Sequence, residues 1–328
     1  MKANKILTKK KIYRTKIPLF LVVISLIFIP FFIKSPYILH VIIMCEIYLI
    51  LSSSYNLLAG YTGALSLCHH SFFGIGAYAS ALLMLRLSFP FPLAFILAGI
   101  IASIFSLAIA YPSLKLSYHS LATGTLAFSI ILYILSLNLV WLTNGPAGIP
   151  GIPSPNFLGW RINNLTEFYY FTLVLDIVTL VVLYRVLHSR VGRALIAIRE
   201  DEILASVVGI NINKYKIISF MVASFFAGIA GSIYASYISF IAPDLFWLYF
   251  LTILLIFFVI GGSAAYPTFY GIIISTILFV LIPEVLRIIP ELREMIFGLT
   301  LIAILIFMPE GIGGKLRDLS KRFLHTTE

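Results

Sequence analysis

The chain of 328 residues has an unusual balance of residue types: 61% are apolar, only 11% are charged, and the mean hydropathy is +1.05. Soluble domains are roughly half apolar and about a quarter charged, so this chain has too few charges to cover a water-exposed surface. A lipid bilayer removes that requirement, because helices that face lipid are apolar on their outside. The composition therefore excludes a large soluble domain and indicates a membrane domain with short loops.

Apolar stretches of about twenty residues, the length needed to cross a bilayer, predict about ten transmembrane helices. The spans lie near 17–33, 38–58, 71–88, 92–112, 120–142, 168–187, 215–239, 247–264, 268–287 and 294–309. A basic leader, 1–16, precedes the first span, and no small-x-small cleavage site follows it, so we expect that helix to be retained. The prediction is an all-α, polytopic integral membrane protein with one transmembrane domain, 17–310, and a basic tail, 311–328.

The basic residues predict the orientation of these helices. Cytoplasmic segments of membrane proteins carry the excess of lysine and arginine. With both termini in the cytoplasm, all but five of the 23 lysines and arginines fall on the cytoplasmic side. The five exceptions are Lys34, Arg86, Arg161, Arg287 and Arg293. This distribution favours an even number of spans, with an outer loop at about 143–167 and a charged cytoplasmic loop at about 188–214. It also accounts for the net charge of +10 without nucleic-acid binding.

Several site types are absent from the sequence. Cys45 and Cys68 lie in apolar stretches and form neither a disulfide framework nor a metal-ligand cluster, so we interpret both as packing residues. We find no complete nucleotide-binding loop, catalytic triad or zinc-binding helix motif. The sequence therefore predicts a protein that is not an enzyme and holds no cofactor or metal of its own.

A segment dense in small and hydroxylated residues, 59–78, interrupts the apolar pattern. Glycine lets the backbone leave helical geometry or lets two helices approach closely. Transporters use broken helices near the bilayer midplane to meet polar substrates. The segment is therefore either part of a translocation pathway or a cytoplasmic turn followed by a closely packed helix. A shorter segment of the same kind follows near 261–267. The candidate pathway residues are Gly60, Thr62, Gly63, Ser66, Ser71, Gly74, Gly76, Gly261 and Gly262.

Ionisable residues inside predicted spans form a second group of candidates. Such residues are functional hypotheses by default, because charge is costly in lipid. Glu46 and Asp176 either relay protons or pair with hydroxyl groups of the bundle, and the second interpretation is preferred because neither has a basic partner at helical spacing. His69 and His70 point about 100° apart on a helix, which argues against a shared metal.

The cytoplasmic loop contains a predicted helix at 199–208 that ends at Gly209. Its apolar residues Ile203, Leu204, Val207 and Val208 share one face. The surrounding chain is too short to bury that face. It therefore suits either a groove on a partner protein or the membrane surface.

Taken together, these segments resemble the permeases of branched-chain amino acid ABC importers, of the LivM type. The resemblance covers about 55–315 and rests on GYTGALSLCHHSFFGIGAY at 60–78, LTNGPAGIP at 142–150, GRALIAIREDE at 192–202, FFAGIAGSIY at 225–234 and MPEG at 308–311. It implies a prokaryotic cell-membrane importer. The implied partners are a second, LivH-like permease subunit, two cytoplasmic ATPases that bind ATP and magnesium, and an extracytoplasmic substrate-binding protein.

The resemblance also implies roles for particular residues. The cytoplasmic loop would contact the ATPases through Arg193, Arg199, Glu200, Glu202, Ala205 and Gly209. Asp201 departs from the importer signature, which has alanine there, and this puts the individual contact residues in doubt. Thr143, Asn144 and Gly145 of the outer loop would face the binding protein. Two alternatives stay open: a urea or short-amide ABC permease on the same scaffold, and an ion-coupled secondary transporter that uses Glu46 and Asp176.

Overall fold

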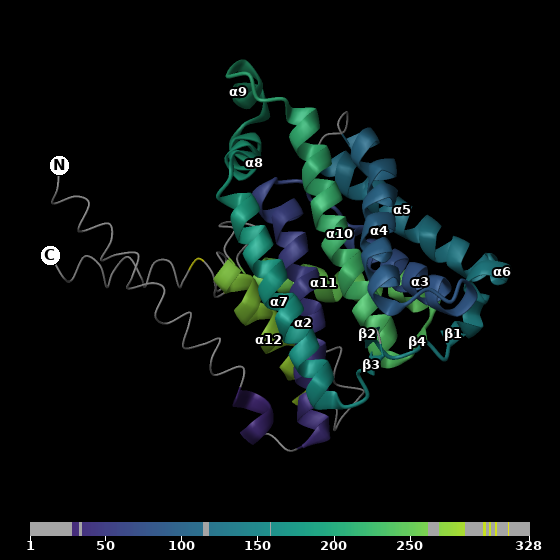
Figure 1. Cartoon of the computed structure of the whole chain (residues 1–328). Coiled ribbons are helices and arrows are strands. Elements are labelled where there is room, and N and C mark those ends of the chain that lie inside the picture. The colour runs from purple at the N-terminus through teal and green to yellow at the C-terminus, as the bar shows by residue number, and fades with distance from the viewer. Residues whose placement is uncertain are drawn as a thin grey trace, which may run out of the picture.

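The structure is a computed structural model that describes residues 28–32, 35–113, 118–157, 159–261 and 269–285, together with residues 298, 299, 302, 306 and 314. Most of this part of the chain is helical (Figure 1). The helices are α2 (Pro36–Tyr55), the π-helix η1 (Asn56–Tyr61), α3 (His69–Arg86), α4 (Phe91–Ser113), α5 (Tyr118–Asn138), α6 (Val140–Thr143), η2 (Gly145–Ala147), α7 (Leu165–Leu187), α8 (Arg190–Glu200), α9 (Glu202–Val207), α10 (Ile212–Ile238), η3 (Pro243–Phe246), α11 (Leu248–Ile260) and α12 (Phe269–Val285).

Five described helices are long and apolar enough to cross a membrane: Pro36–Tyr61, Phe91–Pro112, Ser120–Asn138, Leu165–Leu187 and Ile212–Ile238. Leu248–Ile260 and Phe269–Leu281 are shorter apolar helices. The chain is thus a helical, polytopic membrane protein, as predicted. Each predicted span between 38 and 287 coincides with a helix to within a few residues. The predicted spans 17–33 and 294–309 lie mostly outside the described residues, so the count of ten stays a prediction.

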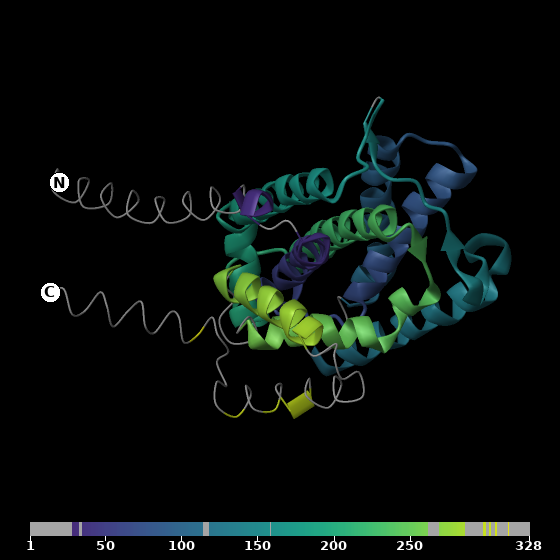
Figure 2. The same cartoon turned by 90° about the horizontal axis from the view of Figure 1, so that it is seen from below.

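The centre of the bundle is formed by α2 and α10, with the other helices around them (Figure 2). Helix α10 packs closely against α3 and α4 as well as against α2. A Cβ atom on Gly76 of α3 would collide with the backbone of Gly228 on α10, and one on Gly231 would collide with the carbonyl oxygen of Phe73. Small residues at helix crossings let membrane helices approach to this extent. Gly76, Gly228 and Gly231 therefore set the distance between α3 and α10.

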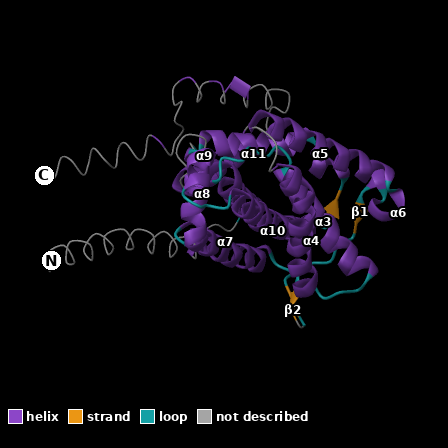
Figure 3. Ribbon diagram, turned by 90° about the horizontal axis from the view of Figure 1, so that it is seen from above, coloured by secondary structure: helices purple, strands orange, loops and turns teal. Residues whose placement is uncertain are grey.

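Short β-ladders lie at the end of the bundle opposite α8 and α9 (Figure 1). Strand β1 (Ile149–Pro150) pairs antiparallel with β4 (Phe240–Ile241), and β2 (Asn156–Phe157) forms a hairpin with β3 (Trp160–Arg161). At the other end, α8 and α9 lie beside α7 and α10 (Figure 3). The predicted outer loop and the predicted cytoplasmic loop are therefore at opposite ends of the molecule.

Candidate functional site

The helix that begins at Pro36 is broken where the sequence becomes rich in glycine. Helix α2 passes into one π-helical turn, η1, and the backbone of 62–68 is not helical before α3 begins at His69. A π-helical turn within an α-helix is rare and often marks a functional site. Thr62, Ala64, Ser66 and Cys68 in the broken segment are buried. The segment is thus an internal break of the bundle and not an exposed turn.

The broken segment is held by local polar contacts and by one contact from helix α5. The Thr62 hydroxyl donates to the carbonyl oxygen of Leu57 at 3.0 Å, and the backbone N–H of Leu67 donates to the Thr125 hydroxyl of α5 at 2.8 Å. Ser66 Oγ lies 3.3 Å from the Sγ of Cys68. Cys45 and Cys68 are buried free thiols, as expected of packing residues. These contacts satisfy backbone groups that a broken helix exposes, which is a requirement at membrane depth.

The two histidines at the start of α3 contact different parts of the bundle. His69 Nε2 lies 2.9 Å from the Oγ of Ser54, and His70 Nε2 lies 3.1 Å from the carbonyl oxygen of Phe246. The Ser54 hydroxyl donates its hydrogen to the carbonyl oxygen of Leu51, so it accepts from His69. Both rings therefore carry the proton on Nε2 and leave Nδ1 as an acceptor.

Several polar atoms near the break are buried without a hydrogen-bond partner in the described part of the chain. They are the Nδ1 atoms of His69 and His70 and the hydroxyl groups of Ser53 and Ser71. Buried polar atoms are almost always paired, so an unpaired group calls for a water or a ligand. This concentration of unpaired atoms coincides with the break in the helix. No group of three or more His, Cys, Asp or Glu side chains suited to a metal occurs among the described residues.

The glycines of the predicted pathway fall into three groups. Gly74 faces the ring of Phe246, and Gly76 faces the backbone of α10, so both serve close packing inside α3. Gly60 is buried within η1, and Gly63 has a φ of +72° beside it. Gly261 caps α11 and is buried, whereas Gly262 lies outside the described residues.

The intramembrane acids lie together between α2 and α7. The Thr172 hydroxyl donates to Glu46 Oε2, and Asp176, one turn further along α7, is close enough to interact electrostatically with Glu46. Glu46 is thus paired with a hydroxyl group, as the preferred interpretation expects. Asp176 Oδ1 has no hydrogen-bond partner in the described residues.

The cytoplasmic segment contains two short helices and not the single helix predicted at 199–208. Asp201 is extended between α8 and α9, with φ −161° and ψ 115°, and its carboxylate accepts from the backbone N–H groups of Ile203 and Leu204 at 2.8 and 3.0 Å. Aspartate is among the best N-cap residues, because its side chain satisfies N–H groups that a helix start leaves unpaired. The prediction of a continuous helix was wrong for this reason.

The predicted apolar face of this segment is confirmed. Ile203, Leu204, Val207 and Val208 are 76%, 64%, 77% and 73% exposed. Ala205 is buried on the opposite side, and Gly209 ends the turn after α9 with a φ of +85°. Glu202 forms an ion pair with Lys216 of α10 at 2.6 Å, whereas Arg193 and Glu200 are exposed. Helix α9 thus presents apolar residues outward, while the ion pair of its first residue, Glu202, attaches it to α10.

Arg199 connects the cytoplasmic segment to the broken helix. A Cβ atom on Gly63 would lie 3.1 Å from Cγ of Arg199 and 3.5 Å from its Cβ. Helix α8 also packs on η1, with Leu195 and Ile198 buried. A predicted coupling residue and a predicted pathway residue are therefore in direct contact, although 136 residues of sequence separate them.

The outer turn at 143–145 uses its polar groups internally. The Thr143 hydroxyl donates to the carbonyl oxygen of Ser136 at 2.6 Å, and the Asn144 amide donates to that of Gly148 at 2.7 Å. Thr143 and Gly145 are buried, and Asn144 is the exposed member of the three. Their role in docking stays a prediction.

Comparison with known proteins identifies the family of this bundle. The family model for the permease component of branched-chain amino acid transport systems matches residues 37–305. The chain belongs to this family. It is 30% identical to the high-affinity branched-chain amino acid transport system permease protein LivM of Salmonella typhimurium, over 82% of this chain and 68% of that protein. No solved structure matches the chain.

Two further relatives extend the comparison. The permease is 29% identical to the probable LivM protein of Methanocaldococcus jannaschii, over 67% of each chain. It is 25% identical to the LivH protein of Escherichia coli, over 82% of this chain and 91% of that protein. The family that the sequence resembles is thus confirmed.

Some residues of the permease site were not predicted from the sequence. Thr125, Thr172 and Lys216 reach the site from helices distant in sequence, and Ser54 reaches it from the end of α2. The only local signal among them is the run of three serines at 52–54 inside an apolar span. Polar residues in such a span face the bundle interior, so this run indicated where α2 meets polar neighbours.

Proposed function

We propose that the chain is a transmembrane subunit of an ATP-driven importer for branched-chain amino acids. Membership of the permease family supports the substrate class, and the names of the LivM and LivH relatives support a complex with a second, LivH-like permease. In this proposal both termini are cytoplasmic and ten helices cross the cell membrane of a prokaryote. Two ATPases bind ATP and magnesium, and an extracytoplasmic binding protein delivers the substrate.

The observation that carries the proposal is the contact between Arg199 and Gly63. In an alternating-access cycle, closure of the ATPases must move the segment that lines the pathway. Helix α9 exposes an apolar face for a partner, and α8 lies directly on η1 and the break at 62–68. A movement of α8 and α9 would therefore reach the unpaired polar atoms near His69 and His70.

In the proposed cycle, the unpaired polar atoms near the break bind the polar groups of the substrate. The two Nδ1 atoms are acceptors and suit an ammonium group, whereas the Ser71 hydroxyl can donate to a carboxylate. Affinity at this site need not be high, because the binding protein supplies specificity before transfer. The substrate does not have to meet a fixed charge, which would be costly in the bilayer.

Affinity purification of the tagged chain from gently solubilised native membranes, with companions identified by mass spectrometry, tests the proposal. We expect recovery of two ATPase subunits and a second permease. Competition of transport by leucine, isoleucine and valine, and its indifference to urea and short amides, distinguishes the proposed substrates from the alternative on the same scaffold. Recovery of an active, lone polypeptide would contradict the proposal.

Changing Val207 to aspartate should abolish recruitment of the ATPases. The charge would have to be desolvated in an apolar interface, and a buried unpaired carboxylate costs several kcal/mol. Co-purification of the ATPases from detergent measures the effect. Ser206→Asp is the matched control, since it adds the same charge to the same helix outside the apolar face, and it should retain the ATPases. Equal recovery with both variants would remove the assigned role of the apolar face.

The pair Glu46 and Asp176 supports a second candidate, an ion-coupled transporter. In that case Glu46→Gln and Asp176→Asn would abolish uptake, and uptake would not require ATP. We expect the opposite for an importer of this family: both variants should keep ATP-dependent uptake in proteoliposomes, and a pH gradient without ATP should drive none. Uptake by the isolated chain in a pH gradient alone would favour the second candidate.

A further inference from the structure

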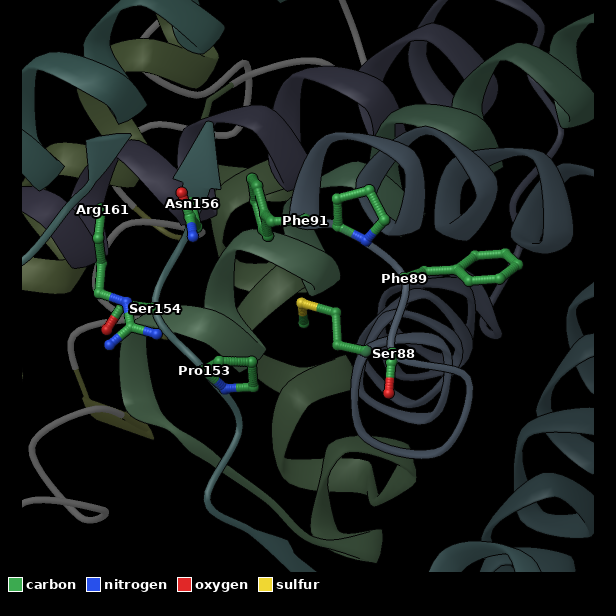
Figure 4. Close-up of a pocket in the computed structure, with 9 residues that line it drawn as sticks. Ser88, Phe89, Phe91, Pro153, Ser154, Asn156 and Arg161 are labelled. Atoms are coloured by element: carbon green, nitrogen blue, oxygen red, sulfur yellow. The ribbon is translucent and has the colours of Figure 1, made fainter. Parts of the chain in front are cut away.

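A pocket opens at the end of the bundle that carries the β-strands. It has a volume of about 270 Å³ and lies between the turn that joins α3 to α4 and the β2–β3 hairpin. Its lining residues are Met84, Ser88, Phe89, Pro90, Phe91, Pro153, Ser154, Asn156 and Arg161. Figure 4 shows Arg161 and Ser154 on one side of the pocket and Ser88 and Phe89 on the other.

The walls of this pocket are held in place by local structure. Pro90 and Pro153 have fixed φ angles, and Ser88 is held in the left-handed region with a φ of +53°. Across the pocket, the hairpin pairs Asn156 with Arg161, and Asn156 Oδ1 accepts from the backbone N–H of Gly159 at 3.0 Å. The pocket is therefore formed before any ligand arrives, which reduces the entropy lost on binding.

The charge of the pocket selects an anion. Arg161 is the only charged residue among its lining residues. Among the described residues, no carboxylate pairs with Arg161. A guanidinium group offers two parallel N–H donors that match the two oxygens of a carboxylate. The remaining walls combine the polar side chains of Ser88, Ser154 and Asn156 with apolar ones. The pocket therefore suits an acidic side chain whose carboxylate pairs with Arg161 and whose methylene groups contact Met84 and Phe91.

We infer that this pocket receives an acidic side chain of the extracytoplasmic binding protein. The inference rests on the proposed function. It changes the expected place of docking from residues 143–145 to the pocket beside Ser154 and Arg161. The β2–β3 hairpin, which forms one wall of the pocket, lies at the end opposite α8 and α9 (Figure 1), where that partner must arrive in the proposed orientation. A free amino acid fits the pocket less well, because no lining carboxylate is present to pair with its ammonium group. An arginine among aromatic residues in a pocket is typical of an interface hot spot.

Reversal of the charge at Arg161 tests the inference in the complete complex. The permease complex and its binding protein are purified from native membranes and reconstituted in nanodiscs. We expect Arg161→Glu to weaken binding of the binding protein at least tenfold and to remove its stimulation of ATP hydrolysis, with basal hydrolysis unchanged. The affinity of Arg161→Lys for the binding protein should lie between those of the wild type and Arg161→Glu, because lysine keeps the charge and loses the paired donors. Trp160→Ala changes the exposed neighbour outside the pocket and should bind normally.

A cross-linking experiment identifies the occupant. A photoreactive group attached to Ser154→Cys should label a surface peptide of the binding protein that contains Asp or Glu. Replacement of that acid by arginine should restore binding to Arg161→Glu. If Arg161→Glu does not assemble, Arg161→Gln removes the charge without reversing it and gives the same comparison.

Three results would overturn the inference. The first is binding of the partner by Arg161→Glu as tightly as by the wild type, and the second is a labelled peptide that contains no acid. The third is loss of the variant's effect in nanodiscs without anionic lipid, which would assign the pocket to a lipid phosphate. Failure of the proposed function is a different result, since the wild-type complex itself would then bind no binding protein.

Discussion

Replacing Gly63 with alanine should reduce transport about tenfold or more while the protein still inserts and assembles. The φ of +72° at this position costs a residue with a side chain about 1–2 kcal/mol, which corresponds to roughly a tenfold change in an equilibrium. In addition, the new Cβ would lie 3.1 Å from Cγ of Arg199, so Arg199 would have to shift by a few tenths of an ångström and its contact with the broken helix would change. Uptake and ATP hydrolysis measured together should show hydrolysis that no longer drives transport.

Gly151→Ala is the matched control for this experiment. Gly151 also has a positive φ, +77°, but a Cβ there meets no atom within 4 Å. The two variants therefore share backbone strain and differ in the contact with Arg199. We expect the loss to shrink when Gly63→Ala is combined with Arg199→Ala, because that change removes the crowded atom. An equal loss of transport in Gly63→Ala and Gly151→Ala would show that strain alone acts and that the contact carries no signal.

The second large effect concerns stability. Gly76→Ala should lower the melting temperature of the purified protein by about 5 °C or more, since the Cβ would collide with the backbone of Gly228 and force α3 away from α10. Thermal unfolding in detergent, followed by size-exclusion chromatography, measures this effect. Gly99→Ala offers the comparison: its Cβ would meet the ring edge of Phe225, which is a side chain and can move. Similar melting temperatures for the two variants would contradict the assigned role of the glycine contact.

The helices of this fold were predictable because hydrophobic length and basic-residue placement are local properties of the sequence. The boundaries of α4, α7 and α10 lie within a few residues of the predicted spans. The β-ladders were not predicted. Strand β1 pairs with β4 from a distant part of the chain, and two-residue strands leave no alternation to detect. Asp201 shows a further limit of prediction from sequence. The residues on both sides of it favour a helix, but its side chain caps α9 and so divides the predicted helix into α8 and α9.

The sequence predicted which segment forms the candidate site but not which residues of that segment contact which helices. Small residues near 60–78 indicated a broken helix, and the break is present. The same composition did not separate Gly63, which contacts the cytoplasmic segment, from Gly76, which packs against α10. That distinction depends on which helix lies opposite each residue. The contact between Glu46 and Thr172 likewise depends on the packing of α2 against α7.

Helix α10 has a mechanical consequence for the whole molecule. Its 27 residues span about 40 Å as one rod, at 1.5 Å per residue. Near its first turn, Lys216 is tied to Glu202, and just past its last turn the carbonyl oxygen of Ser239 accepts from the backbone N–H groups of Gly151 and Ile152 at 3.0 and 3.3 Å. A tilt of only about 5° at one end would displace the other by roughly 3–4 Å, given that length. Helix α10 would then transmit a movement from one face of the membrane to the other as a single stiff lever. No series of smaller rearrangements within the bundle would be needed.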